Sequence, residues 1–108
     1  MGIMAFTPMG NTVSFTAAVT APAAVQASGS IIGATQYRVH NTGNVAVFLG
    51  FGSTANAAAN VANASVSGST IVLVPSSVEI FTFNANQFFT GATSSGTAVV
   101  YVTPGDGI

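Results

Sequence analysis

The sequence predicts an all-β protein, an antiparallel β-sandwich or small jelly roll with an extended N-terminal arm. About seven to nine short runs of β-branched and aromatic residues are separated by turn residues at intervals of roughly 8 to 12 positions, with no convincing helix. A chain of 108 residues is long enough for one domain with a real core. We divide it into an arm, residues 1–11, and a single sandwich domain, residues 12–108.

The predicted N-terminal arm is apolar and has no regular period. Pro8 prevents a helix from running through it, because proline lacks a backbone N–H and clashes with the preceding turn. An apolar segment left in water is costly, so the arm either folds over its own domain or docks on a neighbouring subunit, and both remain open. Its apolar side chains are Ile3, Met4, Phe6 and Met9.

The first predicted strand is Thr12–Thr16, where apolar and hydroxyl residues alternate. Residues 17–27 are rich in alanine but broken by Pro22, so we expect two short extended pieces there. Residues 53–63 fit one helical turn and an ordered loop equally well. The other predicted strands are 37–40, 45–51, 70–74, 78–83, a short one within 84–91, and 97–103.

The stretch Tyr37–Gly52 is predicted to be a hairpin at the centre of the fold. Its first arm, 37–40, alternates apolar and polar side chains, and the Asn-Thr-Gly-Asn turn after it tolerates positive φ. The second arm, 45–51, is apolar on both faces, which predicts a central core strand. The polar face of the first arm carries the chain's only arginine and only histidine, Arg38 and His40.

Charged residues make up 3% of the chain, against about 25% in typical soluble domains. The surface must therefore be built from small uncharged residues, which repel neighbouring copies weakly, and we expect the chain to associate. A net charge of −1 supplies no basic stripe for phosphates, which argues against nucleic-acid binding. Because the chain has no cysteine, neither a disulfide framework nor a thiolate metal site is expected.

Mean hydropathy is +0.64, but Gly, Ser, Thr or Asn interrupts every apolar run before the ~18 residues that a membrane-spanning helix needs. We therefore expect no transmembrane helix. Residues 1–28 lack a basic start and are broken by Pro8, Asn11 and Pro22, which argues against a secretory signal.

One motif of known chemistry occurs, since Gly50–Ala55 matches the G-x-G-x-x-G/A pattern of dinucleotide-binding folds. Such a fold needs a phosphate-binding helix, a βαβ crossover and an acid about 20 residues further on. The next acid here is Glu79, and no other βα unit is predicted. We interpret the glycines as residues that shape a strand.

Catalytic chemistry would depend on His40 as a base, with Glu79 or Asp106 as an orienting carboxylate. The spacing selects no serine as a nucleophile, and no pair of metal ligands stands at a recognisable interval. We therefore predict a protein that is not an enzyme, with no catalytic, cofactor-binding or metal-binding residues. Arg38 and Glu79 fit two roles equally well, pairing with each other or with a partner protein.

Five segments together resemble a group of small structural proteins of tailed bacteriophages, the minor virion or capsid decoration (cement) proteins. The resemblance covers about two thirds of the chain, residues 35–108, and depends on turn residues and strand composition. The segments are Arg38–Gly43, Val47–Gly52, Val72–Pro75, Glu79–Phe81 and Tyr101–Gly107.

The resemblance implies a compact sandwich or jelly roll that binds the outside of an assembled shell of major capsid protein. It also implies a homodimer or a trimer, of which we predict the homodimer, and a place on the capsid exterior of the virion. We further expect synthesis in the host bacterial cytoplasm, and the resemblance supplies no enzymatic residue. The alternatives are a phage tail, collar or fibre component and a small carbohydrate-binding β-sandwich. The residues that we predict to contact a partner are Ile3, Met4, Phe6, Met9, Arg38, His40, Glu79, Phe88 and Phe89.

Overall fold

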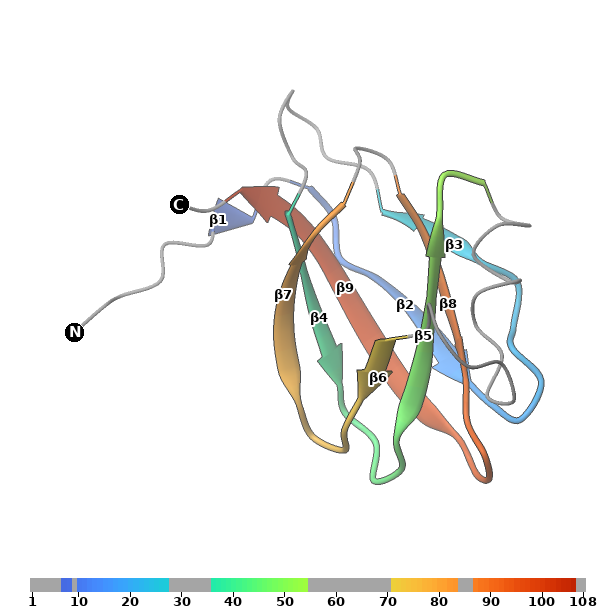
Figure 1. Ribbon diagram of the computed structural model, residues 1–108. Helices are drawn as coiled ribbons and strands as arrows, with labels where there is room; N and C mark the ends of the chain where they lie inside the picture. Colours follow the sequence, from blue (N-terminus) through green and yellow to red (C-terminus); the bar gives the residue numbers. More distant parts are fainter. Residues whose placement is uncertain (1–6, 9, 28–35, 55–70, 84–86, 107–108) are drawn as a thin grey trace.

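Two antiparallel β-sheets pack around a shared core in the computed structural model (Figure 1). The structure describes residues 7–8, 10–27, 36–54, 71–83 and 87–106, and these contain strands but no helix. The all-β prediction and the two antiparallel sheets are therefore confirmed, in a sandwich-like arrangement. The first sheet contains β1 (Thr7–Pro8), β2 (Val13–Ala17), β4 (Gln36–Asn41), β7 (Val78–Thr82) and β9 (Ala98–Asp106). The second contains β3 (Val25–Ala27), β5 (Val47–Gly52), β6 (Ile71–Leu73) and β8 (Gln87–Ala92).

The strand pairing is nested from the ends of the chain toward its middle. In the first sheet, β9 lies between β4 on one side and β1 and β2 on the other, and β7 forms the far edge beyond β4. The order in the second sheet is β3-β8-β5-β6. Strand β2 pairs with β9, β3 with β8, β4 with β7, and β5 with β6. Apart from β5 and β6, consecutive strands from β2 onwards therefore lie in opposite sheets.

The prediction of a hairpin at Tyr37–Gly52 is wrong. Strand β4 pairs with β7 and β9 in the first sheet, whereas β5 pairs with β6 and β8 in the second. The inward and outward positions predicted along each arm are correct. The turn between the arms, however, is a corner that carries the chain from one sheet to the other. The central position predicted for the second arm is confirmed, because β5 lies between β8 and β6.

The side chain of Asn41 fixes this corner. Its Nδ2 donates to the carbonyl oxygens of Val45 at 3.0 Å, Leu73 at 3.1 Å and Val74 at 3.2 Å, while its Oδ1 accepts from Gly43 N at 3.0 Å. Asn41 is fully buried, so these bonds replace the water that its amide loses. The amide thereby joins the end of β4 to the start of β5 and the end of β6.

Glycine is required at position 43. A Cβ built on Gly43 would overlap both Cβ and Cα of Ala98. The corner therefore packs directly against the start of β9, and a larger residue would push the two apart.

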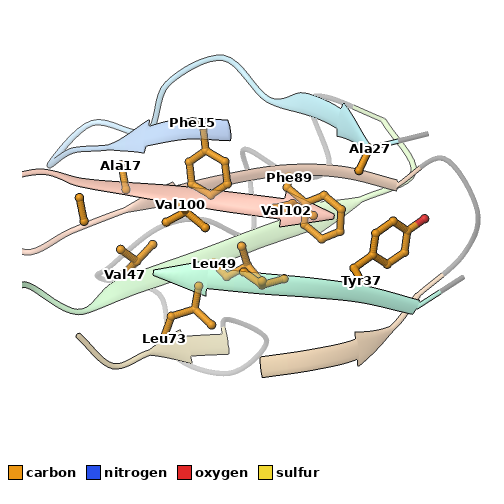
Figure 2. Packing of buried hydrophobic residues seen from close by; sticks show 12 residues of the cluster. Phe15, Ala17, Ala27, Tyr37, Val47, Leu49, Leu73, Phe89, Val100 and Val102 are labelled. Atoms are coloured by element: carbon orange, nitrogen blue, oxygen red, sulfur yellow. The ribbon is translucent and has the colours of Figure 1, made fainter. Parts of the chain in front are cut away.

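The core lies between the sheets and is filled by alternating side chains from both (Figure 2). Tyr37 and Phe89 are fully buried and meet edge to face, with ring centroids 5.0 Å apart. Phe83 stacks on Phe51 at 4.7 Å and contacts Phe89 at 5.6 Å. Burial of each large side chain contributes about 1.5–3 kcal/mol to stability. These rings form the aromatic end of the core, opposite the Asn41 corner.

Phe89 was predicted to contact a partner, and this prediction is wrong. Its side chain is 0% exposed and belongs to the aromatic end of the core. Neighbouring positions of a strand point to opposite sides, so Phe88, which is half-buried, lies on the outward side of β8.

Part of the predicted N-terminal arm is a strand of the same chain's own sheet. Thr7 and Pro8 pair with Asp106 and Gly105 as strand β1. This segment therefore docks in cis. The residues predicted to make contacts from this arm, Ile3, Met4, Phe6 and Met9, lie outside the described residues.

Two other predicted segments differ from the structure in extent. Of the two extended pieces expected in residues 17–27, only β3 is a regular strand. The short strand expected within 84–91 is the six-residue β8, which occupies an interior position in the second sheet. Residues 55–63, for which a helical turn and a loop were both open, lie outside the described residues.

Candidate interaction surface

The first sheet presents one broad face to solvent, which we call the outer face of the first sheet. Cross-strand partners share a side of a sheet, and Val39 and Val102, which pair with each other, are both fully buried. Arg38 and His40 flank Val39 in β4 and therefore lie on the opposite side, together with Tyr101 of β9. This face brings together the only arginine and the only histidine of the chain.

The register places apolar side chains directly beside both Arg38 and His40. Arg38 lies opposite Ile80 of β7 and Thr103 of β9. His40 lies opposite Val78 of β7 and Tyr101 of β9. Such partners have Cβ atoms about 4.5–5.5 Å apart. The exposed fractions are 46% for Val78, 40% for Ile80 and 44% for Tyr101.

The composition of this face changes from one edge to the other. On the β2 side it carries exposed hydroxyls, Ser14 and Thr16 within the strand and Thr12 just before it. Thr12 Oγ1 and Thr103 Oγ1 are 2.8 Å apart and share a hydrogen bond. Arg38 and His40 follow on β4, and Val78 and Ile80 on β7. From β2 to β7, the face therefore changes from hydroxyl groups to a guanidinium with an imidazole, and then to exposed aliphatic side chains.

Neither Arg38 nor His40 has a side-chain partner within the part of the chain that the structure describes. Arg38 is exposed and His40 half-buried, and no hydrogen bond or ion pair engages either side chain there. An arginine has five N–H donors, which leaves Arg38 able to receive an external acceptor.

Glu79 does not join this face. It pairs in register with Val39, so it lies on the core side of β7, and it is exposed because β7 is an edge strand. Arg38 pairs with Ile80, one position further along. The two charges therefore lie on opposite sides of the sheet, and of the two roles open to them, pairing with each other is not realised among the described residues.

The outer face of the second sheet is shielded along β8. Thr90 and Ala92 point outward from β8 but are only 0% and 2% exposed. The connection between β2 and β3 runs beside them. Thr90 Oγ1 donates to Pro22 O at 2.7 Å, and Thr93 N donates to Ala18 O at 2.9 Å. The edge strand β6 still exposes one large side chain, Val72, at 52%.

The described residues gather no set of catalytic groups. Ser14 and His40 lie on the same face, but Tyr101 of β9 separates them, which places them two strands or about 10 Å apart. Among the residues that the structure describes, two buried polar atoms have no hydrogen-bond partner, Ser77 Oγ beside the Asn41 corner and Gln87 Oε1 at the aromatic end. They lie at opposite ends of the molecule and form no common site.

Metal and membrane signals are absent from the part of the chain that can be described. No group of three or more His, Cys, Asp or Glu side chains is found there. The same residues contain no helix long and apolar enough to cross a membrane. Gly50 and Gly52 of the dinucleotide-like motif lie within β5 itself, and the two residues after it, Ser53 and Thr54, are exposed and not helical.

The structure divides the predicted contact residues. Arg38 and His40 lie together, Glu79 lies on the other side of the sheet, Phe88 is on the second sheet and Phe89 is in the core. Sequence reasoning missed three residues of the outer face, which are Val78, Ile80 and Tyr101. A signal for them existed, because Tyr101 interrupts a run of valines at an outward position and the alternation in 78–83 puts Val78 and Ile80 on one side.

Comparisons with protein-family models, with curated proteins and with solved structures each find no match to this chain.

Proposed function

We propose that this chain is a non-enzymatic virion structural protein that binds the outer surface of a tailed-phage capsid and stabilises contacts between major capsid protein subunits. The observation that carries the proposal is the outer face of the first sheet. The chain has 3% charged residues, and one of them, Arg38, has no partner among the described residues. Exposed Ile80 lies beside Arg38, and exposed Val78 and Tyr101 lie beside His40. Such a face resembles the centre of a protein interface more than a solvated surface.

The composition supports an assembly role. Small uncharged side chains give adjacent copies little electrostatic repulsion, so many copies can occupy one shell. Individually weak contacts then hold firmly, since binding at many linked sites gains avidity. Self-association as a homodimer in preference to a trimer stays a prediction.

The nested strand order supports a jelly roll. Pairing of β2 with β9, β3 with β8, β4 with β7 and β5 with β6 is what results when one long hairpin is rolled into two sheets. Jelly rolls of eight strands occur in viral capsid proteins and also in lectins. The strand order therefore agrees with a virion protein and keeps carbohydrate binding as an alternative.

The physical mechanism is thermodynamic linkage. A protein that binds the assembled shell but not its free subunits stabilises the shell, by about 2.7 kcal/mol per site at a concentration 100 times its dissociation constant.

The test uses shells of the encoding virus assembled without this chain. Purified chain is added, and co-sedimentation and the temperature of shell disassembly are measured. We expect saturable binding, a higher disassembly temperature and no binding to dissociated capsid protein. Electron microscopy that locates the chain only on the tail would replace this proposal with the tail component, and absence from virions would refute both.

The arm has its own test. Removal of residues 1–10 should lower shell occupancy if the apolar arm contacts a neighbour. Because this deletion also removes β1 from β9, thermal unfolding of the truncated chain must be compared first. Unchanged occupancy by a folded truncated chain would exclude the arm from the interface.

A carbohydrate-binding role has one observation in its favour, the exposed ring of Tyr101 beside His40. Sugar sites use such aromatic platforms together with polar neighbours. Clear hits on a glycan array, lost in a Tyr101→Ala variant, would favour this role over shell binding.

A further inference from the structure

We infer that the outer face of the first sheet is the surface that docks on the shell, and that it receives a carboxylate surrounded by apolar side chains on a capsid protein. This inference rests on the proposed function and adds which face binds and what chemistry it recognises. It also removes Glu79, Phe88 and Phe89 from the predicted contact residues.

The first feature that supports this inference is Arg38, which is free to bind an external acceptor as far as the described residues are concerned. Arg38 is the only arginine of the chain, which has no lysine. Within the described residues, no hydrogen-bond acceptor contacts its guanidinium. A carboxylate is the acceptor that fits a guanidinium best, because two parallel N–H···O bonds form at once.

The second feature is the set of exposed apolar side chains beside Arg38 and His40. Ile80 lies directly beside Arg38, and Val78 and Tyr101 flank His40. When a partner covers these side chains, water leaves the arginine as well, and the attraction between opposite charges grows as the local dielectric constant falls. Buried arginines and tyrosines with apolar neighbours are the residues that dominate binding energy in protein interfaces.

The third feature is the row of hydroxyl side chains on and beside β2. Thr12, Ser14 and Thr16 line the β2 side of the face and can exchange hydrogen bonds with a partner or with water. Polar groups at the margin of a contact that also contains apolar side chains are usual in protein interfaces. The aliphatic side is bounded by β7, an edge strand.

A second copy of this chain fits the face poorly. In a two-fold interface the same patch meets itself, and this patch carries Arg38 and His40 while the one acidic side chain that the structure describes, Glu79, points to the other side. Two copies would bring one arginine toward the other with no described counter-charge. A capsid protein surface that presents a carboxylate among apolar side chains is the complementary occupant.

Polyanions and glycans fit less well. One arginine releases too few counterions to hold a nucleic acid, and the face exposes aliphatic Val78 and Ile80 where sugar sites place aromatic rings.

The first experiment identifies the neighbour in assembled virions. Tyr101 is replaced by the photo-crosslinker p-benzoylphenylalanine, and a matched variant carries it at Val72, which is similarly exposed on the other sheet at 52%. We expect position 101 to crosslink to an acidic surface of a capsid protein and position 72 to do so at least about tenfold less. Mass spectrometry of the adducts locates the contact.

Each other outcome has a defined meaning. A crosslink from position 101 to an acidic surface of a tail protein keeps the inferred face and refutes the shell function. A crosslink to a second copy of this chain, equal yields at both positions, or no protein adduct from either overturns the inferred face. Wild-type occupancy of shells is measured in parallel and decides the proposed function separately.

The second experiment measures affinity with paired variants of the full chain on purified shells. Arg38→Glu should weaken binding by about tenfold or more, because it opposes two carboxylates. Arg38→Lys should weaken it by only about threefold, since the charge remains but the planar fork is lost. Val78→Asp should weaken binding strongly, whereas Val72→Asp, the same change on the other sheet, should not. Equal effects of the two valine changes, or tighter binding by Arg38→Glu, would overturn the inference.

Discussion

The outer faces of the two sheets differ although the nested pairing gives the sheets similar strand orders. On the first sheet, one or more outward side chains of β4, β7 and β9 are exposed, namely Arg38, Val78, Ile80 and Tyr101. On the second, outward Thr90 and Ala92 of β8 are buried beside the connection from β2 to β3. The difference arises from where a connection runs, because that segment follows β8 and leaves β9 uncovered. Two similar sheets thereby differ, because the outer face of the second is shielded along β8 whereas Tyr101 of β9 is exposed on the first.

The largest expected effect separates the two sides of β8. Phe89→Ala removes a fully buried ring and should lower the free energy of unfolding by about 3–5 kcal/mol. Phe88→Ala, on the half-buried outward side, should cost about 1 kcal/mol. Urea denaturation of both variants measures the difference. Similar losses would show that the outer side of β8 contributes to stability as the core does.

The next effect concerns the joint that holds the two sheets at one end. Asn41→Ala leaves the carbonyl oxygens of Val45, Leu73 and Val74 without their donor, and should cost about 2–4 kcal/mol. Asn44→Ala changes an exposed asparagine in the same turn and should stay within about 0.5 kcal/mol. Thermal unfolding followed by circular dichroism compares them, and equal stabilities would contradict the role given to Asn41.

The smallest expected effect concerns the contact between β8 and the connection that shields its outward side. Thr90→Val removes the hydroxyl that donates to Pro22 O and should cost about 1–2 kcal/mol. Thr16→Val, an outward and exposed threonine on the first sheet, should change stability by less than about 0.5 kcal/mol. Hydrogen exchange of the amides in 18–24 should also speed up in the Thr90 variant alone. Unaltered exchange would mean that the connection is held by other contacts.

Alternation along each strand predicted most strand positions and most of the core. Alternation could not predict strand pairing. A two-residue period indicates which side chains point inward, but it does not indicate which sheet the strand joins. The Asn-Thr-Gly-Asn turn suits a hairpin and a corner alike, and only the buried contacts of Asn41 with β6 decide between them.

The candidate surface was harder to predict for the same reason. Arg38 and His40 were correctly placed side by side, but Glu79 was grouped with them by charge although its register with Val39 turns it away. Phe88 and Phe89 are adjacent aromatics of which a sandwich buries only one, and sequence alone does not choose between them. Exposure of Val78 and Ile80 follows from the edge position of β7, which is a property of the complete sheet.

The nested pairing also has a consequence for synthesis. Strands β1 and β2 are made before β9, yet β9 is their pairing partner. The first sheet therefore cannot close until β9 has been made, and its formation depends on contacts between distant parts of the sequence, which form slowly. A chain that stopped before Ala98 would leave β2 with none of the strand partners described for it, so the outer face of the first sheet needs β9 to form.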